Sequence, residues 1–345
     1  MKMKAAVFEG PEKISVQEVD LAPCGDDDIV MKVYACGICG SDIRNYKTGL
    51  KGDIKSQIMG HEFTGTVTEV GKNVTHYKVG DHLAVAPDVS CGECWYCKRG
   101  LVNLCVSHRM VGTHWPGGFA EYVHLPKVVL DRGMVHHIPE GLSLEDAALS
   151  EPASSVIAAQ ENADVGLGDT VLIIGDGPIG CLHIDVARAR GAAKVIMAGL
   201  MRLKEAERFK PDLLIDAGSQ DTVAEVLKAS DGLGADVAIT ANPVASTQAQ
   251  AVKAVRKRGK VVLFGGLPKM APETTLDGNL IHYGEITVMG AFSYPAYIHQ
   301  KALATIKAGL IQPSMYFNMI VSLDDIVSGF TAAAAGKALK VLVKP

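Results

Sequence analysis

Apolar and polar residues follow two different patterns along the chain. Up to about residue 150, short apolar runs end in glycine turns, as in IVMKVYACG (29–37), FTGTVTEVG (63–71) and FAEYVHL (119–125). Runs of this length that are rich in β-branched and aromatic residues predict strands, and no long helical periodicity interrupts them. The first 150 residues therefore predict an irregular, mostly β domain.

From Thr170 onward, predicted strands alternate with predicted helices. The strands are TVLIIG (170–175), KVIMAG (194–199), DLLIDAG (212–218), ADVAITA (235–241) and KVVLFGG (260–266), and the helices are PIGCLHIDVARAR (178–190), Arg202–Phe209, Val223–Ala229 and Thr247–Lys257. This alternation predicts right-handed βαβ units and a doubly wound parallel sheet, which is an α/β fold.

The tail after about residue 291 contains an expected helix, KALATIKAGL (301–310), and a short strand, KVLVKP (340–345). It carries no nucleotide-binding signal of its own, so we expect it to return to the first domain. The predicted organisation is a mostly β domain at 1–150, an α/β domain at 151–290 and a C-terminal segment at 291–345.

The loop GDGPIG follows the strand TVLII and opens a helix, the context in which G-x-G-x-x-G predicts dinucleotide binding. Gly175 allows the tight turn, Gly177 lets the backbone approach the pyrophosphate, and Gly180 permits close packing of helix and strand. Pro178 and Ile179 form the first helical turn, whose free N–H groups face the phosphates. A strand-to-helix turn without a ligand is the alternative.

The end of the next strand predicts which cofactor is bound. An Asp or Glu is expected there if the ribose 2′-hydroxyl is held, but KVIMAG ends at Gly199 and no carboxylate occupies that end. Arg202 and Lys204 follow, and both would attract a 2′-phosphate. The sequence therefore favours NADP(H). NAD(H) stays possible if these two cations are only a solvated helix face.

Four of the eight cysteines lie close together as C-x2-C-x2-C-x7-C, at Cys91, Cys94, Cys97 and Cys105. Four thiolates on a short loop can close a tetrahedron around Zn²⁺ and leave no open position, which predicts a structural zinc. Unpaired surface cysteines or two disulfides are the alternative. A nucleic-acid-binding zinc ribbon is disfavoured because the chain has a net charge of −4 and no basic stripe.

A second set of metal ligands is spread along the chain. Cys39 lies in GICGSD, His61 and Glu62 lie in MGHEFTG, and Glu151 lies in SEPASS. Each alone has an ordinary structural interpretation, but together they suit a zinc with three protein ligands and one open position. Such a zinc binds a substrate oxygen and lowers the pKa of its hydroxyl. Ser41 could pass the substrate proton toward solvent, or it could merely bond the local backbone.

Composition limits the cellular compartments and the kinds of binding partner that are expected. The balance of 48% apolar and 21% charged residues is typical of a globular protein. No run approaches the roughly 18 apolar residues of a membrane span, and MKMKAAVFEG lacks a secretory pattern, so we expect a cytoplasmic protein without membrane or nucleic-acid partners.

The order of these motifs resembles the zinc-containing medium-chain alcohol dehydrogenases, nearly from end to end. The segments ACGICGSD, MGHEFTGTVTEVG, GGFAEYV, SEPASS and VLIIGDGPIG look most like the polyol (sorbitol-type) branch. The resemblance implies a GroES-like catalytic domain, a Rossmann cofactor domain with the active site in the cleft against it, and a homodimer or homotetramer. It also implies a catalytic zinc near Cys39, His61 and Glu62, Glu151 as a ligand or a partner of its water, and Ser41 in the proton relay.

The sequence departs from the polyol branch at the expected substrate positions. In AFSYPAY, Ser293 stands where an arginine is expected, and Tyr294 is kept. Asn45 stands where sorbitol enzymes often have tyrosine, with Tyr46 next. Asn45, Tyr46 and Tyr294 are therefore the candidate substrate contacts. The missing arginine is consistent with a smaller, a more neutral or a differently oriented substrate, so sorbitol itself is not the expected substrate.

These features predict hydride transfer between NAD(P) and a secondary alcohol of a small polyol or sugar-derived substrate. A threonine-type amino alcohol or a polyol phosphate is an alternative substrate. A non-catalytic dinucleotide-binding protein is a third hypothesis, which the presence of Cys39, His61 and Glu62 disfavours.

Overall fold

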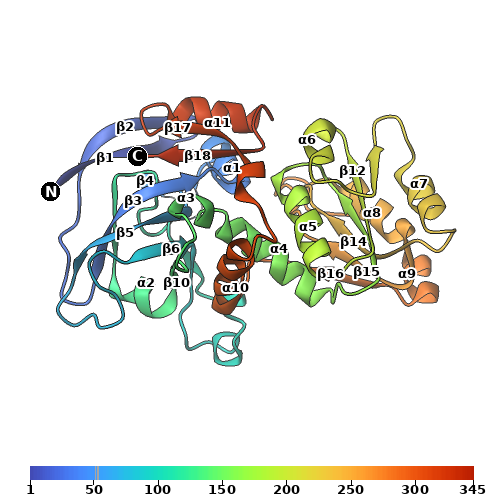
Figure 1. The fold of residues 1–345 in the computed structure, drawn as a ribbon, viewed down its shortest axis with the longest axis horizontal. Coiled ribbons are helices and arrows are strands. Elements are labelled where there is room, and N and C mark those ends of the chain that lie inside the picture. The colour runs from blue at the N-terminus through green and yellow to red at the C-terminus, as the bar shows by residue number, and fades with distance from the viewer. Residues whose placement is uncertain (51, 53) are drawn as a thin grey trace. The chain divides into compact units, whose positions relative to one another are not determined.

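The computed structural model describes residues 1–50, 52 and 54–345. The described chain forms two compact units, one of Met1–Ser154 with Tyr294–Pro345 and one of Ser155–Ser293. In Figure 1 the first unit therefore carries both the blue and the red ends of the chain. The tail from Tyr294 to Pro345 belongs to the first unit. None of the described helices is long and apolar enough to cross a membrane.

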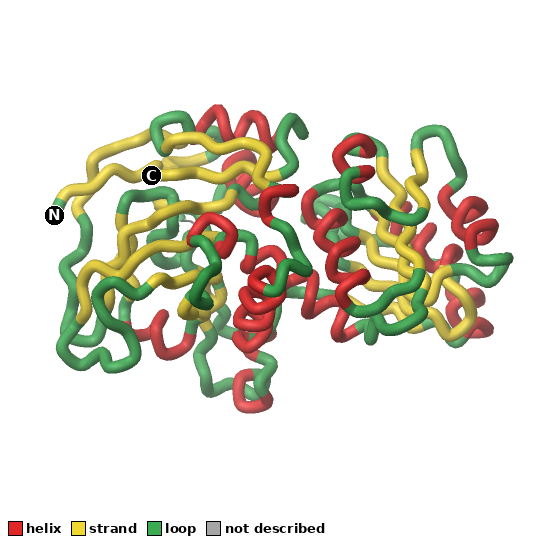
Figure 2. Tube along the Cα trace, viewed as in Figure 1, coloured by secondary structure: helices red, strands yellow, loops and turns green. Residues whose placement is uncertain are grey.

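Strands dominate the first unit (Figure 2). They are β1 (Lys2–Gly10), β2 (Lys13–Asp20), β3 (Ile29–Gly37), β4 (Gln57–Ile58), β5 (Glu62–Val70), β6 (His82–Ala86), β7 (Asp88–Val89), β8 (Arg109–Met110), β9 (Tyr122–Leu125), β10 (Met134–His137), β17 (Phe317–Ser322) and β18 (Lys340–Lys344). Among the described residues, the main sheet runs β10-β6-β5-β3-β18-β17, with β9 paired to β3. The sheet therefore pairs a strand of the C-terminal tail, β18, with β3 near the start of the chain.

The helices of this unit are short, apart from α4, which begins in it, and α10. They are α1 (Gly40–Thr48), α2 (Lys127–Arg132), α3 (Leu144–Ala147), α4 (Ser150–Asn162), α10 (Ala296–Lys307) and α11 (Ile326–Ala334), with 3-10 helices η1 (Cys97–Arg99), η2 (Val102–Leu104) and η3 (Pro313–Met315). Helix α1 was not predicted, because its only buried residue is Asp42 and no apolar stripe marks it.

The second unit is a parallel sheet in the order β13-β12-β11-β14-β15-β16. Its elements are β11 (Thr170–Ile174), α5 (Pro178–Ala189), β12 (Lys194–Gly199), α6 (Leu203–Glu207), β13 (Leu213–Asp216), α7 (Thr222–Ala229), β14 (Ala235–Thr240), α8 (Ala245–Ala254), β15 (Val255–Leu263), α9 (Gly278–Gly284) and β16 (Thr287–Gly290). The order reverses between β11 and β14, and ligands bind at such a switch point in open α/β sheets. GDGPIG begins directly after β11, at this point.

One predicted boundary in this unit is wrong. The helix expected over Thr247–Lys257 ends at Ala254, and β15 begins at Val255 instead of Lys260. Val255 pairs with Ala235 before an irregularity shifts the register, so that Lys260 pairs with Val237. Pairing with β14 therefore overrides the helical preference of this segment.

Candidate active site and metal centres

Cys39, His61 and Glu62 come together at one end of the main sheet. Cys39 precedes α1, His61 precedes β5, and Glu62 is the first residue of that strand, paired with Gly37 of β3. One ligand atom from each side chain lies within 4.8 Å of the others. His61 is 7% exposed and Glu62 is 0% exposed, so the cluster is largely shielded from water. Sulfur, imidazole and carboxylate ligands at this spacing fit a zinc ion.

Asp42 fixes the orientation of His61. Its Oδ1 lies 3.3 Å from Nδ1 of His61, and its Oδ2 accepts a 3.0 Å hydrogen bond from the backbone N–H of Cys39. Burial would lower the pKa of His61, but the Asp42 carboxylate beside it raises that pKa well above the usual range. With Nδ1 directed at Asp42, Nε2 is the ring nitrogen available to a metal, the arrangement typical of metal-binding histidines.

Lys340 of β18 neutralises Glu62. Its ammonium donates to Glu62 Oε1 at 2.6 Å and to the carbonyl oxygen of Ile38 at 3.2 Å, and it also pairs with Glu62 Oε2. Burial would lower the pKa of Lys340, but the carboxylate of Glu62 raises it. A Cβ on Gly37 would lie 2.1 Å from Glu62 Oε2, so a larger residue there would displace the carboxylate from its present position.

Ser41 lies beside the cluster, with its Oγ 3.4 Å from Nε2 of His61. The hydroxyl can therefore exchange protons with a group bound at the position that His61 faces. This geometry suits a relay residue, and the role stays a prediction.

Glu151 is not one of the three clustered ligands in the described part of the chain. It accepts a 2.9 Å hydrogen bond from the hydroxyl of Tyr294. Burial raises the pKa of Glu151 to about 7, against the opposing effect of nearby His61. The structure therefore joins Glu151 and Tyr294 as a buried pair near the cluster.

A chain of buried polar groups continues from Ser150. Ser150 Oγ donates to the carbonyl oxygen of Ala147 at 2.6 Å and lies 2.8 Å from Nε2 of His299. It must therefore accept from Nε2–H, which leaves Nδ1 of His299 to accept from Nδ1–H of His136 at 2.9 Å. Both imidazoles are neutral in this arrangement. Burial and the neighbouring His136 lower the pKa of His299 to about 3.

The other two candidate substrate residues lie on α1. The hydroxyl of Tyr46 donates to the carbonyl oxygen of Glu12 at 3.1 Å, and its ring packs 5.3 Å from that of Phe330. These contacts give Tyr46 a packing role under α11. Asn45 accepts the N–H of Gly49 through its backbone carbonyl at the end of α1. Substrate contact by either residue stays a prediction.

The four-cysteine lobe forms a second set of ligands around η1 and η2. The Sγ atoms of Cys91, Cys94, Cys97 and Cys105 all lie within 4.8 Å of one another. Cys94 and Cys97 are 3.4 Å apart and Cys91 and Cys97 are 3.9 Å apart, measured between sulfurs. A tetrahedron with Zn–S bonds of about 2.3 Å places its sulfurs about 3.8 Å apart, whereas a disulfide needs about 2.05 Å. The lobe therefore fits a zinc ion and not two disulfides.

Backbone groups support thiolates in this lobe. The N–H of Cys94 donates to Cys91 Sγ at 3.4 Å, and the N–H groups of Cys97 and Val106 lower the pKa of Cys94 to about 6. Gly92 and Gly100 adopt positive φ angles of 74° and 76°, as the predicted turning of the backbone requires.

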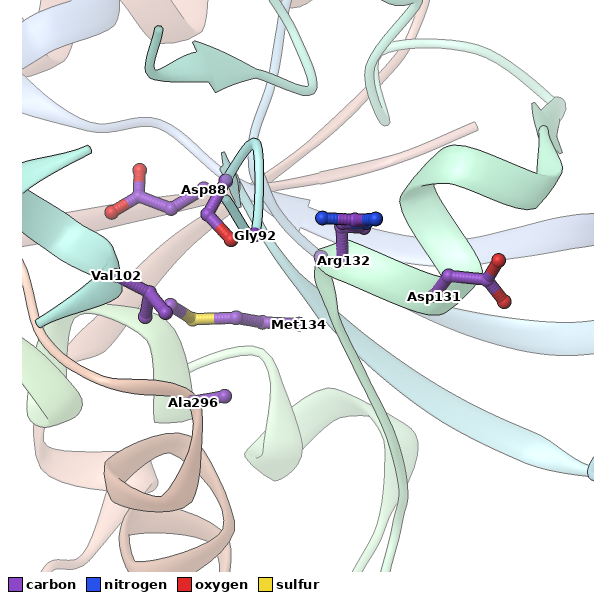
Figure 3. Close-up of a pocket in the computed structure, with 9 residues that line it drawn as sticks. Asp88, Gly92, Val102, Asp131, Arg132, Met134 and Ala296 are labelled. Atoms are coloured by element: carbon purple, nitrogen blue, oxygen red, sulfur yellow. The ribbon is translucent and has the colours of Figure 1, made fainter. Parts of the chain in front are cut away.

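A cavity of about 330 Å³ lies beside this lobe (Figure 3). It is lined by Asp88, Ser90, Gly92, Val102, Asp131, Arg132, Gly133, Met134 and Ala296. Arg132 donates to the carbonyl oxygen of Cys91. None of the Cys39, His61 and Glu62 side chains lines this cavity, so it is separate from the buried cluster.

The GDGPIG loop has the expected backbone geometry. Gly175 adopts φ 128°, and a Cβ on Gly180 would lie 1.8 Å from the carbonyl oxygen of Gly175. Gly177 caps α5, and Pro178 and Ile179 open it. Only glycine therefore fits at 175 and 180, and the N–H groups of α5 are presented at the switch point of the sheet.

Strand β12 ends at Gly199, as expected, and not at an acidic residue. A carboxylate from outside the strand lies there instead, since Oδ2 of Asp176 accepts the N–H groups of Leu200, Met201 and Arg202. Arg202 Nη1 lies 3.9 Å from the position of a Cβ on Gly177, which places its guanidinium beside the loop. Lys204 is exposed on α6.

Sequence reasoning missed three residues of these sites. Asp42 lies within the motif GICGSD and Asp176 within GDGPIG. The usable signal for Asp42 was a carboxylate three residues after the expected ligand Cys39. Lys340 had no local signal, because its partner is 278 residues away.

Comparisons with known proteins agree with this geometry. A family model for the alcohol dehydrogenase GroES-like domain matches residues 25–140, and one for zinc-binding dehydrogenases matches residues 178–308. Sorbitol dehydrogenase of Bacillus subtilis (strain 168) is 34% identical over 99% of this chain and 97% of its own length. The chain belongs to the zinc-binding alcohol dehydrogenase family. The resemblance inferred from the sequence, including its polyol branch, is confirmed.

Two further relatives extend the comparison of this dehydrogenase. D-arabitol-phosphate dehydrogenase of Enterococcus avium is 31% identical over 100% of this chain and 97% of its own. A zinc-binding dehydrogenase of Sinorhizobium meliloti 1021, solved with NADP, has a TM-score of 0.92 and 33% identity, with 100% of both chains covered. The predicted fold is therefore confirmed, and this chain is a zinc-dependent, NAD(P)-linked alcohol dehydrogenase.

Proposed function

We propose that this dehydrogenase oxidises a secondary alcohol of a neutral polyol or sugar-derived substrate to a ketone, with NADP(H) as the favoured cofactor. We further propose two zinc ions per chain, one catalytic and one structural, and a homodimer or homotetramer. The observation that carries the proposal is the shielded set of Cys39, His61 and Glu62, whose ligand atoms lie within 4.8 Å of one another.

We assign a separate role to each residue around Cys39, His61 and Glu62. A zinc ion held there supplies a Lewis acid that lowers the pKa of an alcohol hydroxyl. Cys39 and His61 would hold the ion, and Asp42 would keep Nε2 of His61 directed at it, as the 3.3 Å separation from Nδ1 supports. Ser41, whose Oγ lies 3.4 Å from Nε2 of His61, would pass the proton of the substrate hydroxyl on to a water or a ribose hydroxyl. Lys340 pairs with Glu62 and cancels the charge of its carboxylate.

Cofactor binding is assigned to the second unit. Gly175, Gly177 and Gly180 allow the pyrophosphate to approach the N-terminal turn of α5, where Pro178 and Ile179 lie. Arg202 beside Gly177 and exposed Lys204 supply positive charge for a 2′-phosphate. A nicotinamide cofactor held there would supply the hydride acceptor. NAD(H) stays the alternative cofactor.

Substrate selection is assigned to the first unit. Tyr294 and Glu151 form a buried hydroxyl–carboxyl pair next to the cluster, which suits hydrogen bonds to a polyol. A phosphorylated polyol is the second candidate, since the relative from Enterococcus avium is named for such a substrate. We favour the neutral substrate because the charge of Lys340 is already matched by Glu62. A threonine-type amino alcohol is the third candidate.

One kinetic comparison tests the proposal. Polyols, their phosphates and threonine are each assayed with NAD⁺ and NADP⁺, and zinc per chain is measured on the same preparation. We expect the highest kcat/KM with a neutral polyol and NADP⁺, and two zinc ions per chain. A higher kcat/KM for a phosphate ester would contradict the assigned substrate class. A higher kcat/KM with NAD⁺ would contradict the assigned cofactor.

A further inference from the structure

The turn that follows β12 is held by a side chain from the phosphate-binding loop. The backbone N–H groups of Leu200, Met201 and Arg202 donate to Oδ2 of Asp176 at 2.9, 2.7 and 2.6 Å. Asp176 is only 7% exposed. A carboxylate oxygen that accepts three N–H donors is a strong local restraint on the backbone. Asp176 therefore fixes the conformation of the turn that carries Arg202.

The same side chain fills the space next to Gly199. A Cβ built on Gly199 would lie 2.4 Å from Cβ of Asp176 and 2.6 Å from its Oδ2. Two carbon atoms do not approach this closely without a shift of the backbone. Any residue other than glycine at 199 is therefore incompatible with a side chain at 176 in this conformation, and an acid at 199 is excluded for that reason.

The arrangement determines which charges face a bound cofactor. Oδ2 of Asp176 is committed to the backbone and not offered to a ribose hydroxyl. The guanidinium of Arg202 lies beside the phosphate-binding loop, with Nη1 3.9 Å from the position of a Cβ on Gly177. Among the described residues, its buried Nε has no hydrogen-bond partner. The turn thus presents the guanidinium of Arg202, whereas Oδ2 of Asp176 faces the backbone of the turn.

We propose that Asp176 and Gly199 form a coupled pair that determines cofactor preference. Asp176 closes the end of β12 to the acid that would bind a ribose 2′-hydroxyl, and it holds Arg202 where a 2′-phosphate would meet it. The inference rests on the proposed function for its cofactor, and it makes Asp176 a positioning residue.

The steric part is tested by a cycle of variants in the full chain, with the thermal unfolding midpoint as readout. Gly199→Ala is expected to lower the midpoint in the natural background and to leave it nearly unchanged in Asp176→Gly. In Asp176→Ala, which keeps the Cβ, Gly199→Ala should still lower it. An equal loss in all three backgrounds would overturn the pair.

The cofactor part is tested by titrating NADH and NADPH into the unmodified protein, Gly199→Asp, and Asp176→Gly/Gly199→Asp. Gly199→Asp alone should weaken NADPH binding without tighter NADH binding. The double variant should bind NADH about tenfold more tightly than Gly199→Asp, which is the effect of one hydrogen bond to a charged group. Equal NADH affinity in these two variants would overturn the proposal.

The unmodified protein separates the two possible failures. A preference for NADH there overturns both the assigned cofactor and the role of the pair in choosing it. A preference for NADPH together with additive midpoints overturns the pair alone, and the proposed function stands.

Discussion

The buried cluster and the four-cysteine lobe are both suited to zinc, but they are built in opposite ways. The lobe takes Cys91, Cys94, Cys97 and Cys105 from one continuous loop, and three of these side chains are partly exposed. The cluster takes Cys39, His61 and Glu62 from different segments, with His61 and Glu62 buried. The lobe uses four thiolates and leaves no open position, whereas the cluster mixes ligand types and can leave one.

The surroundings of the two sites differ as much as their ligands do. Thiolates in the lobe are stabilised by nearby backbone N–H groups, such as that of Cys94 on Cys91. The cluster depends on charged side chains from elsewhere, namely Asp42 on His61 and Lys340 on Glu62. A metal site that only holds a loop can be made locally. The buried cluster instead depends on charges that the tertiary fold brings from other segments.

The largest expected difference between the sites is in catalysis. Cys39→Ser should reduce kcat/KM by about a thousandfold or more, because the several kcal/mol of transition-state stabilisation supplied through the metal are lost. Cys97→Ser should keep kcat/KM within about tenfold and instead lower the unfolding midpoint, since the lobe loses a structural ligand. Steady-state kinetics, zinc per chain and thermal unfolding of both variants are the measurements.

Cys24→Ser is the control, because Cys24 is a free cysteine outside both groups. It should leave activity and zinc content unchanged. Full activity in Cys39→Ser, or an inactive but stable Cys97→Ser, would reverse the roles given to the two sites.

The next largest effect is on stability, and it concerns Lys340, the cation that pairs with Glu62. Lys340→Met leaves the carboxylate of Glu62 buried without its cation, so the free energy of unfolding should fall by about 3–5 kcal/mol. Lys340→Met/Glu62→Gln should recover much of this loss, because no unpaired charge remains. Urea unfolding of the two variants measures the difference.

Lys344→Met in the same strand is the matched control. Its partner is Glu145, and both side chains are about one-third exposed, at 36% and 31%. Loss of such a pair should cost at most about 1 kcal/mol. Similar losses for Lys340→Met and Lys344→Met would contradict the special role of the buried pair.

The smallest expected effect is on acid sensitivity. The pKa of His299 is about 3 in the folded protein, below its unfolded value of about 6.5, so the unfolded state binds the proton more readily. The stability that neutral His299 contributes to the folded state is fully present above pH 6.5 and is lost as the pH falls toward 3. At pH 5 this histidine should cost about 2 kcal/mol of stability. Urea unfolding of His299→Gln at pH 7 and pH 5 should show a smaller decline than the unmodified protein does.

His76→Gln serves as the comparison, since His76 is exposed. Its decline between pH 7 and pH 5 should match that of the unmodified protein. An unchanged decline in His299→Gln would mean that the His136–His299 pair does not control the acid response of the first unit.

The sequence predicted those parts of the molecule that short segments specify. The dinucleotide loop is one: Gly175 has a positive φ and Gly180 packs against Gly175, as G-x-G-x-x-G requires. The lobe is another, because fifteen residues contain all four thiolates. Cys39, His61 and Glu62 were also found, since each lies in a recognisable motif and the order of motifs resembles a known family.

One boundary and one helix were predicted less well. Val255 was expected within a helix but pairs with Ala235 of β14, which lies outside the local window of sequence. Helix α1 buries only Asp42, so no apolar stripe revealed it, and its cap is local, between Cys39 and Asp42.

The amino-acid sequence by itself determined the α/β architecture and the family, because both depend on the pattern and order of motifs along the whole chain. It predicted the phosphate-binding loop and the four-cysteine lobe from single short segments, and it predicted Cys39, His61 and Glu62 as metal ligands from motifs in separate segments. The tertiary structure decided that Lys340 cancels the charge of Glu62, that His136 bonds to His299, and that Asp176 fills the space beside Gly199. These contacts depend on distance and burial between segments far apart in sequence, and no local pattern encodes either.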